Sequence, residues 1–182
     1  KINPKYPYSF SKNIGEQTIQ HWSNVFKINF VSLRLFNVYG TRSRTHGAYG
    51  AALGVFLKQK LSKKPFTVVG DGNQKRDFVN VLDVARAFYL SIKTKKKNKI
   101  FNVGYGNPQS INKLLSYLGG KKIFIPKRPG EPDITHANIS LIKKELKWRP
   151  EITLKKGIET VLKEINYWSK APLWTPKKIE KT

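Results

Sequence analysis

Short β-rich runs alternate with helical segments along this 182-residue chain, and this alternation constrains the fold most strongly. The β-rich runs are predicted at 30–40, 65–74, 99–107 and 121–126. The helices are predicted at 10–27, 50–64, 79–92, 111–118, 138–148 and 154–168. Strands that alternate with helices favour parallel pairing, because each helix carries the chain back across the sheet. The sequence therefore predicts an α/β fold with mainly parallel strands.

The glycine-rich turn that opens a dinucleotide-binding domain is missing from this pattern. The stretch GDGNQKRDF, residues 70–78, contains glycines, but it follows a short strand and opens no helix. It also does not match G-x-G-x-x-G. In addition, the chain begins with Lys1 and contains no Met. We therefore expect these residues to be part of a longer reading frame.

Composition excludes several classes of protein. The content of hydrophobic residues is 39%, which is enough for a folded core, and no run approaches the roughly 18 apolar residues of a membrane span. No charged segment followed by an apolar run marks a signal peptide within residues 1–30. The chain has no Cys, and its three His are widely scattered, so we expect no disulfide and no metal site. These features are compatible with the cytoplasm, which we expect to be its location.

The net charge of +24 raises the question of nucleic-acid binding. A basic face can neutralise phosphates and release counterions. However, the lysines are spread along the whole chain, and their densest cluster, KTKKKNK at 93–99, is typical of a solvated loop. No arginine-rich helix or aromatic-interleaved basic strand accompanies them. A Lys-rich surface on an ordinary enzyme is therefore favoured over a nucleic-acid site.

Tyr8 and Lys12 lie one helical turn apart in the stretch YPYSFSKNIGEQ. An ammonium group near a phenol favours the phenolate and lowers the pKa of the tyrosine from its usual value near 10. Such a tyrosine can take a proton from a sugar hydroxyl while a hydride leaves the carbon. Y-x-x-x-K is a weak signal by itself, because the spacing also arises by chance on helix surfaces.

Several motifs in order give the pair more weight. They are PYSFSKNIGEQ, VSLRLFNVYGTR, FTVVGDGNQKRDFVNVLDVARAF, FNVGYGNPQSINKLL and RPGEPDITHANISLIKKELKWRP. Together they resemble the extended short-chain dehydrogenase/reductase family, most closely its nucleotide-sugar epimerase and dehydratase branch. The resemblance covers nearly the whole chain. It implies the C-terminal portion of a Rossmann-type parallel sheet plus a small α/β substrate-binding domain.

The resemblance also implies roles for individual residues. Tyr8 would be the catalytic acid/base, and Lys12 would lower its pKa and bind the nicotinamide ribose of NAD. Leu35 and Phe36 would lie beside the nicotinamide. The expected substrate-binding residues are Asn37 at the diphosphate, Arg76 and Arg128 at the diphosphate and nucleotide ribose, Glu131 at that ribose, and Thr67 at the base. Without these roles, Asn37 is a turn residue, and either arginine forms a surface salt bridge, such as Arg76 with Asp77 or Asp83.

Other parts of the family pattern would lie upstream of residue 1. They are the G-x-x-G-x-x-G turn, about five strands, and the Ser or Thr that assists the tyrosine. The expected division is a remnant of the NAD-binding Rossmann domain at 1–40, a mainly substrate-binding region at 41–169 with segments that return to the Rossmann sheet, and a basic tail at 170–182. In this family, helices like the one at 10–27 pair into a four-helix bundle, so the complete enzyme is expected to be a homodimer.

The implied chemistry is a transient oxidation of a UDP- or dTDP-linked sugar at C4 to a 4-keto intermediate. Return of the hydride to the opposite face gives an epimerase, loss of water across C5 and C6 gives a dehydratase, and decarboxylation of a uronic acid is a third outcome. The residues named above serve all three. Two further alternatives are a non-catalytic nucleotide-sugar-binding fragment and a basic nucleic-acid-binding protein.

Overall fold

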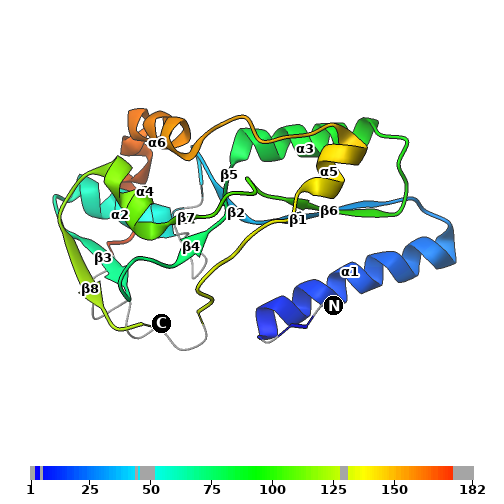
Figure 1. The fold of residues 1–182 in the computed structure, drawn as a ribbon, viewed down its shortest axis with the longest axis horizontal. Coiled ribbons are helices and arrows are strands. Elements are labelled where there is room, and N and C mark those ends of the chain that lie inside the picture. The colour runs from blue at the N-terminus through cyan, green and yellow to red at the C-terminus, as the bar shows by residue number, and fades with distance from the viewer. Residues whose placement is uncertain (1–2, 5, 44, 46–51, 128–130, 174–182) are drawn as a thin grey trace.

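The computed structural model describes residues 3–4, 6–43, 45, 52–127 and 131–173. Within these ranges the strands pair in twos, and three of the four pairs are parallel (Figure 1). The parallel pairs are β1 (Val31–Leu35) with β6 (Lys99–Val103), β2 (Asn37–Tyr39) with β5 (Phe78–Asn80), and β3 (Phe66–Val69) with β8 (Lys122–Ile125). The antiparallel pair is β4 (Lys75–Arg76) with β7 (Gln109–Ser110). The predicted α/β class with mainly parallel strands is confirmed.

The helices agree with the sequence prediction in order, but several of their ends differ. They are α1 (Pro7–Phe26), α2 (Ala52–Leu61), α3 (Val81–Lys93), α4 (Ile111–Leu118), α5 (Ser140–Leu146) and α6 (Leu154–Lys163). Helix α1 begins at Pro7, because proline has a helical φ and its missing N–H costs nothing at the first position. Tyr8 therefore lies inside the first turn. The predicted helix 154–168 stops at Lys163, and a 3-10 helix, η1 (Ile165–Lys170), follows it.

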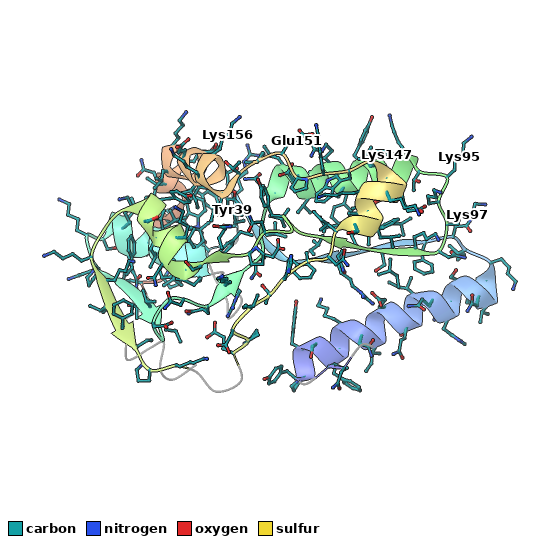
Figure 2. All side chains as sticks on the ribbon, viewed as in Figure 1. Tyr39, Lys95, Lys97, Lys147, Glu151 and Lys156 are labelled. Carbon is teal, nitrogen blue, oxygen red and sulfur yellow. The ribbon has the colours of Figure 1, made fainter. Side chains whose placement is uncertain are left out.

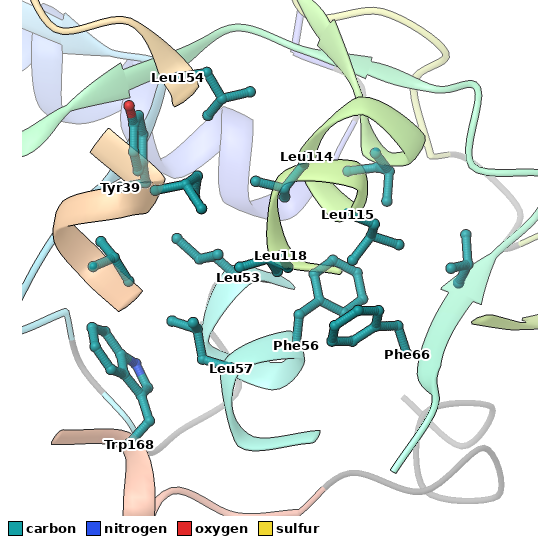
Figure 3. Packing of buried hydrophobic residues seen from close by; sticks show 14 of the residues in the cluster. Tyr39, Leu53, Phe56, Leu57, Phe66, Leu114, Leu115, Leu118, Leu154 and Trp168 are labelled. Atoms are coloured by element: carbon teal, nitrogen blue, oxygen red, sulfur yellow. The ribbon is translucent and has the colours of Figure 1, made fainter. Parts of the chain in front are cut away.

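Two hydrophobic cores hold these elements together. In the first, α3 and α5 cover one side of the β1–β6 pair, with Phe101, Ile142 and Trp148 almost completely buried. The second lies among α2, β3, α4, α6 and η1, where Phe56, Phe66 and Trp168 meet leucines of α2 and α4 (Figure 3). Burial of one such large apolar side chain contributes about 1.5–3 kcal/mol. Helix α6 and η1 contribute together to this second core, through Ile158, Val161 and Trp168.

Tyr39 connects α6 to the end of β2. Its hydroxyl donates to the Thr153 carbonyl at 3.3 Å, and its ring lies against the backbone of Gly157. A Cβ at position 157 would come within 2.1 Å of the Tyr39 hydroxyl oxygen, so only glycine fits there without a shift of the helix. Burial raises the pKa of Tyr39 to about 12, against the weaker opposing effect of a hydrogen bond with Asn80.

This raised pKa predicts a loss of stability at high pH. The unfolded tyrosine ionises near pH 10, and the folded one ionises two units higher, so the folded state holds the proton more tightly. The contribution is complete below pH 10 and is lost as the pH rises from 10 to 12, by at most about 2–3 kcal/mol. We expect the unfolding free energy of the wild type to fall more steeply over this range than that of Tyr39→Phe in chemical denaturation. Parallel curves would contradict the assignment.

Helix α1 lies on the other side of the β1–β6 pair from α3 and α5 (Figure 1). Its face toward the sheet is polar: Glu16 binds Arg34 on β1, and Ser23 is buried and donates to Asn98. Several of its large apolar side chains are exposed, namely Tyr8, Phe10, Ile14, Ile19, Trp22, Val25 and Phe26. A helix normally turns its apolar stripe toward a core. Helix α1 departs from this rule among the described residues.

Candidate functional site

A hollow of about 460 Å³ lies where the parallel strands β3 and β8 end. Val69 and Gly70 form one wall at the carboxyl end of β3, and Lys127 lies just beyond β8. The other wall is the segment 131–134. Ligands of open α/β sheets bind outside the carboxyl ends of the strands, and small-molecule pockets commonly measure about 300–1,000 Å³. Position and size both favour a ligand site.

The hollow carries charges of both signs. Asp71 accepts hydrogen bonds from the backbone and side chain of Asn73, which lower the pKa of the Asp71 carboxyl. Lys127 donates to Asp133 at 2.5 Å, and this hydrogen bond raises the pKa of Lys127. These groups are therefore ionised at neutral pH. A ligand with both hydroxyls and phosphates would find carboxylate acceptors and ammonium donors in one place.

Arg76 and Glu131, 55 residues apart in the chain, form an ion pair at the edge of the hollow. The Arg76 guanidinium donates to Glu131 Oε1 at 2.6 Å, to the Pro132 carbonyl at 2.7 Å and to the Lys75 carbonyl at 2.9 Å. Arg76 is only 8% exposed, whereas Glu131 lines the hollow. The pairing of Arg76 with Asp77 or Asp83, considered from the sequence, is not the one observed. Arg76 fixes the position of Glu131 and of the chain beside it.

Asn37, beyond the carboxyl end of β1, is joined to the same region through Thr135. The Thr135 hydroxyl donates to Asn37 Oδ1 at 3.0 Å and accepts from the backbone N–H of Asp77 at 3.2 Å. The Asn37 N–H in turn donates to the Asp77 carbonyl at 3.1 Å. The structure thus brings three of the predicted substrate-binding residues, Asn37, Arg76 and Glu131, onto one connected framework.

Asp77 organises this framework, a role that was not predicted from the sequence. Its carboxylate is completely buried and accepts from the backbone N–H groups of Tyr105 at 2.5 Å, Gly106 at 3.0 Å and Ala137 at 2.9 Å. In KRDF, Asp77 directly follows Arg76 and was considered from the sequence only as its salt-bridge partner, so no local signal indicated these contacts. Burial makes them necessary, because a buried carboxylate is costly unless it is hydrogen-bonded.

Tyr8 and Lys12 lie one turn apart near the start of α1, and both are exposed. The Lys12 ammonium is 5.4 Å from the centre of the Tyr8 ring, and Tyr8 is 57% exposed. A second pair with identical spacing exists on α3, where the Lys93 ammonium is 4.4 Å from the ring of Tyr89, itself 54% exposed. Local geometry therefore does not separate the two pairs. What distinguishes Tyr8 is its place in the longer series of motifs.

The remaining predicted residues fall in different places. Leu35 ends β1 and is exposed, and Phe36 follows it with its N–H bound to the Val103 carbonyl. Thr67 is buried in β3, where its N–H donates to Gln59 Oε1 at 3.1 Å and its hydroxyl accepts from Gln59 Nε2 at 2.9 Å. The Thr67 N–H is thus already bonded to Gln59 and is not available to a nucleotide base. The predicted contact of Thr67 with the base stays a prediction. Arg128 lies outside the described residues.

The described ranges contain neither a metal-binding cluster nor a membrane-spanning helix. No cluster of three or more His, Cys, Asp or Glu side chains is arranged there to hold a metal ion. No helix in the described part of the chain is long and apolar enough to cross a bilayer.

Comparisons with known proteins place this geometry in context. The sequence model of the NAD-dependent epimerase/dehydratase family matches residues 1–104. A putative UDP-glucose 4-epimerase of Methanocaldococcus jannaschii is 37% identical over 166 residues, which are 88% of this chain and 53% of that protein. The chain thus spans about half the length of the curated relatives that it matches.

Solved structures show the same fold. The UDP-glucuronic acid 4-epimerase of Bacillus cereus, in complex with UDP-glucuronic acid and NAD, superposes with a TM-score of 0.83 and 33% identity, covering 93% of this chain and 55% of that one. The UDP-glucose 4-epimerase of Thermotoga maritima, solved with UDP-glucose, gives a TM-score of 0.82 and 28% identity, covering 92% and 55%.

Proposed function

The chain belongs to the NAD-dependent epimerase/dehydratase family, and on that premise we propose that it is the C-terminal part of an enzyme acting on a nucleotide sugar through a 4-keto intermediate. The observation that carries the proposal is the hollow beyond β3 and β8, with Glu131 held on its edge by Arg76. The hollow lies outside the carboxyl ends of parallel strands, where proteins with open α/β sheets bind ligands. It also presents acceptors for ribose hydroxyls beside cations for phosphates.

The substrate-binding side follows from these contacts. Glu131 accepts hydrogen bonds from the nucleotide ribose, and Asn37, fixed by Thr135, contacts the diphosphate. Arg76 sets the position of Glu131 and adds positive charge near the diphosphate, a task suited to a permanently charged guanidinium. Arg128, predicted for the same task, lies three positions before Glu131 in the sequence and outside the described residues. UDP-linked sugars are favoured, because the similar enzymes described above are UDP-sugar epimerases.

The catalytic side rests on α1. Tyr8 removes the proton from the C4 hydroxyl of the sugar, and Lys12, one turn away, stabilises the phenolate that results. NAD, when bound, supplies the hydride acceptor and donor for this step. The exposure of Leu35 at the carboxyl end of β1, with Phe36 next to it, supports placing the nicotinamide there, and Lys12 on α1 would bind its ribose. Tyr8 then returns the proton when the keto group is reduced.

We propose the same division of the chain that the sequence predicted. Residues 1–40 belong to the NAD-binding Rossmann domain, 41–169 mainly to the substrate-binding region, and 170–182 to a basic tail, of which 174–182 lie outside the described residues. The exposed apolar side chains of α1 other than Tyr8 support a complete enzyme in which this helix packs on the rest of the NAD-binding domain and on a second subunit. The cytoplasm is its proposed location.

Binding of a nucleotide sugar without NAD tests the substrate side of the proposal. We expect the chain to bind UDP-glucose or UDP-glucuronate, and Glu131→Ala to weaken binding by about 10-fold, since hydrogen bonds to a charged group contribute about 1.5–3 kcal/mol. Isothermal titration calorimetry measures this loss. Glu159→Ala, which removes an exposed carboxylate on α6, is the matched control and should change the affinity by less than about twofold.

The outcomes also separate the alternatives. Equal losses in Glu131→Ala and Glu159→Ala would contradict the assignment of the hollow. Sugar binding without turnover, even when NAD and the missing half are supplied, would favour a non-catalytic binding fragment. Tight, salt-sensitive binding of oligonucleotides with no affinity for nucleotide sugars would instead favour a nucleic-acid-binding protein.

A further inference from the structure

A second and larger hollow, of about 850 Å³, lies on the α3 and α5 layer, on the side of the β1–β6 pair away from α1. Its charged lining comprises Arg86, Lys143, Lys147, Arg149 and Glu151, four cations and one carboxylate. Figure 2 shows Glu151 above α3 and Lys147 above α5, along one edge of the molecule. The proposed function uses none of these residues.

The wall of this hollow is firmly attached to α3. The Asp83 carboxylate, almost completely buried, accepts from the backbone N–H groups of Glu151 at 3.1 Å and Ile152 at 3.0 Å. The Asp83 carbonyl accepts from the Trp148 indole at 2.9 Å. Arg86 adds an ion pair with Glu151 and a hydrogen bond to the Arg149 carbonyl. A segment held in this way presents its side chains in a preorganised arrangement, which lowers the entropy cost of binding.

Three cations of the lining remain available to a ligand. Arg86 is occupied by Asp83 and Glu151, and it in turn neutralises Glu151. Among the described residues, no carboxylate lies within ion-pair distance of Lys143, Lys147 or Arg149. Lys143 lies in the last turn of α5, and Lys147, the residue at its C-cap, has a left-handed backbone conformation. Both line the same hollow, so an anion bound there would be attracted by both.

We propose that this hollow binds a phosphate group of a small phosphorylated molecule, with Arg149 as the forked donor and Lys143 and Lys147 as point charges. Guanidinium groups match the geometry of phosphate oxygens, and ammonium groups add attraction without a fixed direction. The volume exceeds that of a bare anion, and Leu90 and Pro150, both partly exposed, supply apolar surface for the organic part. The inference is independent of the nucleotide-sugar site.

The test compares two triple variants that remove the same charge. Lys143→Gln/Lys147→Gln/Arg149→Gln empties the hollow of its available cations. Lys95→Gln/Lys97→Gln/Lys156→Gln removes three exposed lysines elsewhere, as Figure 2 shows. Inorganic phosphate is titrated at fixed ionic strength, and the NMR signal of the Trp148 indole N–H reports binding beside the hollow. We expect the first variant to lose at least ~10-fold in affinity and the second to stay within about twofold of the wild type.

Two results would overturn the proposal. If both variants lost affinity equally, the effect would be that of net charge and not of a site. If a 12-nucleotide single strand shifted the Trp148 signal while inorganic phosphate did not, the surface would bind nucleic-acid backbone instead of a small ligand. A phosphate-dependent shift that only the first variant abolishes would establish the site.

Discussion

Tyr8→Phe is expected to reduce turnover of a nucleotide sugar by about 10²–10⁴-fold in a complete protein that contains both halves, because the variant lacks the group that takes and returns the C4 proton. The ring and its place on α1 are unchanged, so affinity for the sugar should stay within about threefold of the wild type. The measurement is kcat with UDP-glucose or UDP-glucuronate and NAD, together with the sugar affinity by calorimetry.

The chain offers an unusually close control for this experiment. Tyr89→Phe removes the hydroxyl from the other Y-x-x-x-K pair, whose ring is equally exposed and has a lysine ammonium at similar distance. We expect Tyr89→Phe to keep near-normal turnover. If Tyr8→Phe also kept it, Tyr8 would not be the acid/base, and the resemblance would have assigned the role to the wrong residue.

Asp77→Ala is expected to lower the free energy of unfolding by about 3–5 kcal/mol, because it takes the carboxylate acceptor from three backbone N–H groups, one in a buried and two in part-buried hydrogen bonds. For a chain of this size, such a loss lowers Tm by roughly 10 °C or more. Calorimetric or fluorescence-monitored unfolding measures it. Affinity for the nucleotide sugar should fall as well, since the Asp77 backbone also holds Asn37 and Thr135.

Two further variants separate the hydrogen bonds of Asp77 from its charge. Asp77→Asn keeps one acceptor oxygen, so its loss of stability should be smaller than that of Asp77→Ala. Asp133→Ala removes a carboxylate whose side chain is 77% exposed and paired with Lys127, and it should cost less than about 1 kcal/mol. Equal effects of Asp77→Ala and Asp133→Ala would mean that the buried contacts of Asp77 do not stabilise the fold.

Local patterns in the sequence predicted the elements well where one periodicity dominated. The helix 111–118 has the predicted ends, because Ser110 accepts from the Lys113 N–H and thereby fixes the first turn. The strand predicted over 30–40 is divided at Phe36. Residues before it pair with β6, and the Phe36 N–H still donates to β6, whereas the residues after it pair with β5. Such a change of partner depends on distant residues, and no local pattern reports it.

The sequence by itself determined the α/β class, the order of the elements and the family, because these depend on periodicity, turn residues and motifs that lie in order along the chain. Only the tertiary structure decided which charged residues meet. Arg76 pairs with Glu131 and not with a neighbouring aspartate, and Asp77 is a buried acceptor for backbone N–H groups. The tertiary structure alone also brings Lys143, Lys147 and Arg149 together at one hollow. The physical reason is that hydrogen bonds and ion pairs depend on distances of about 3 Å between groups that can be 50 or more residues apart in sequence.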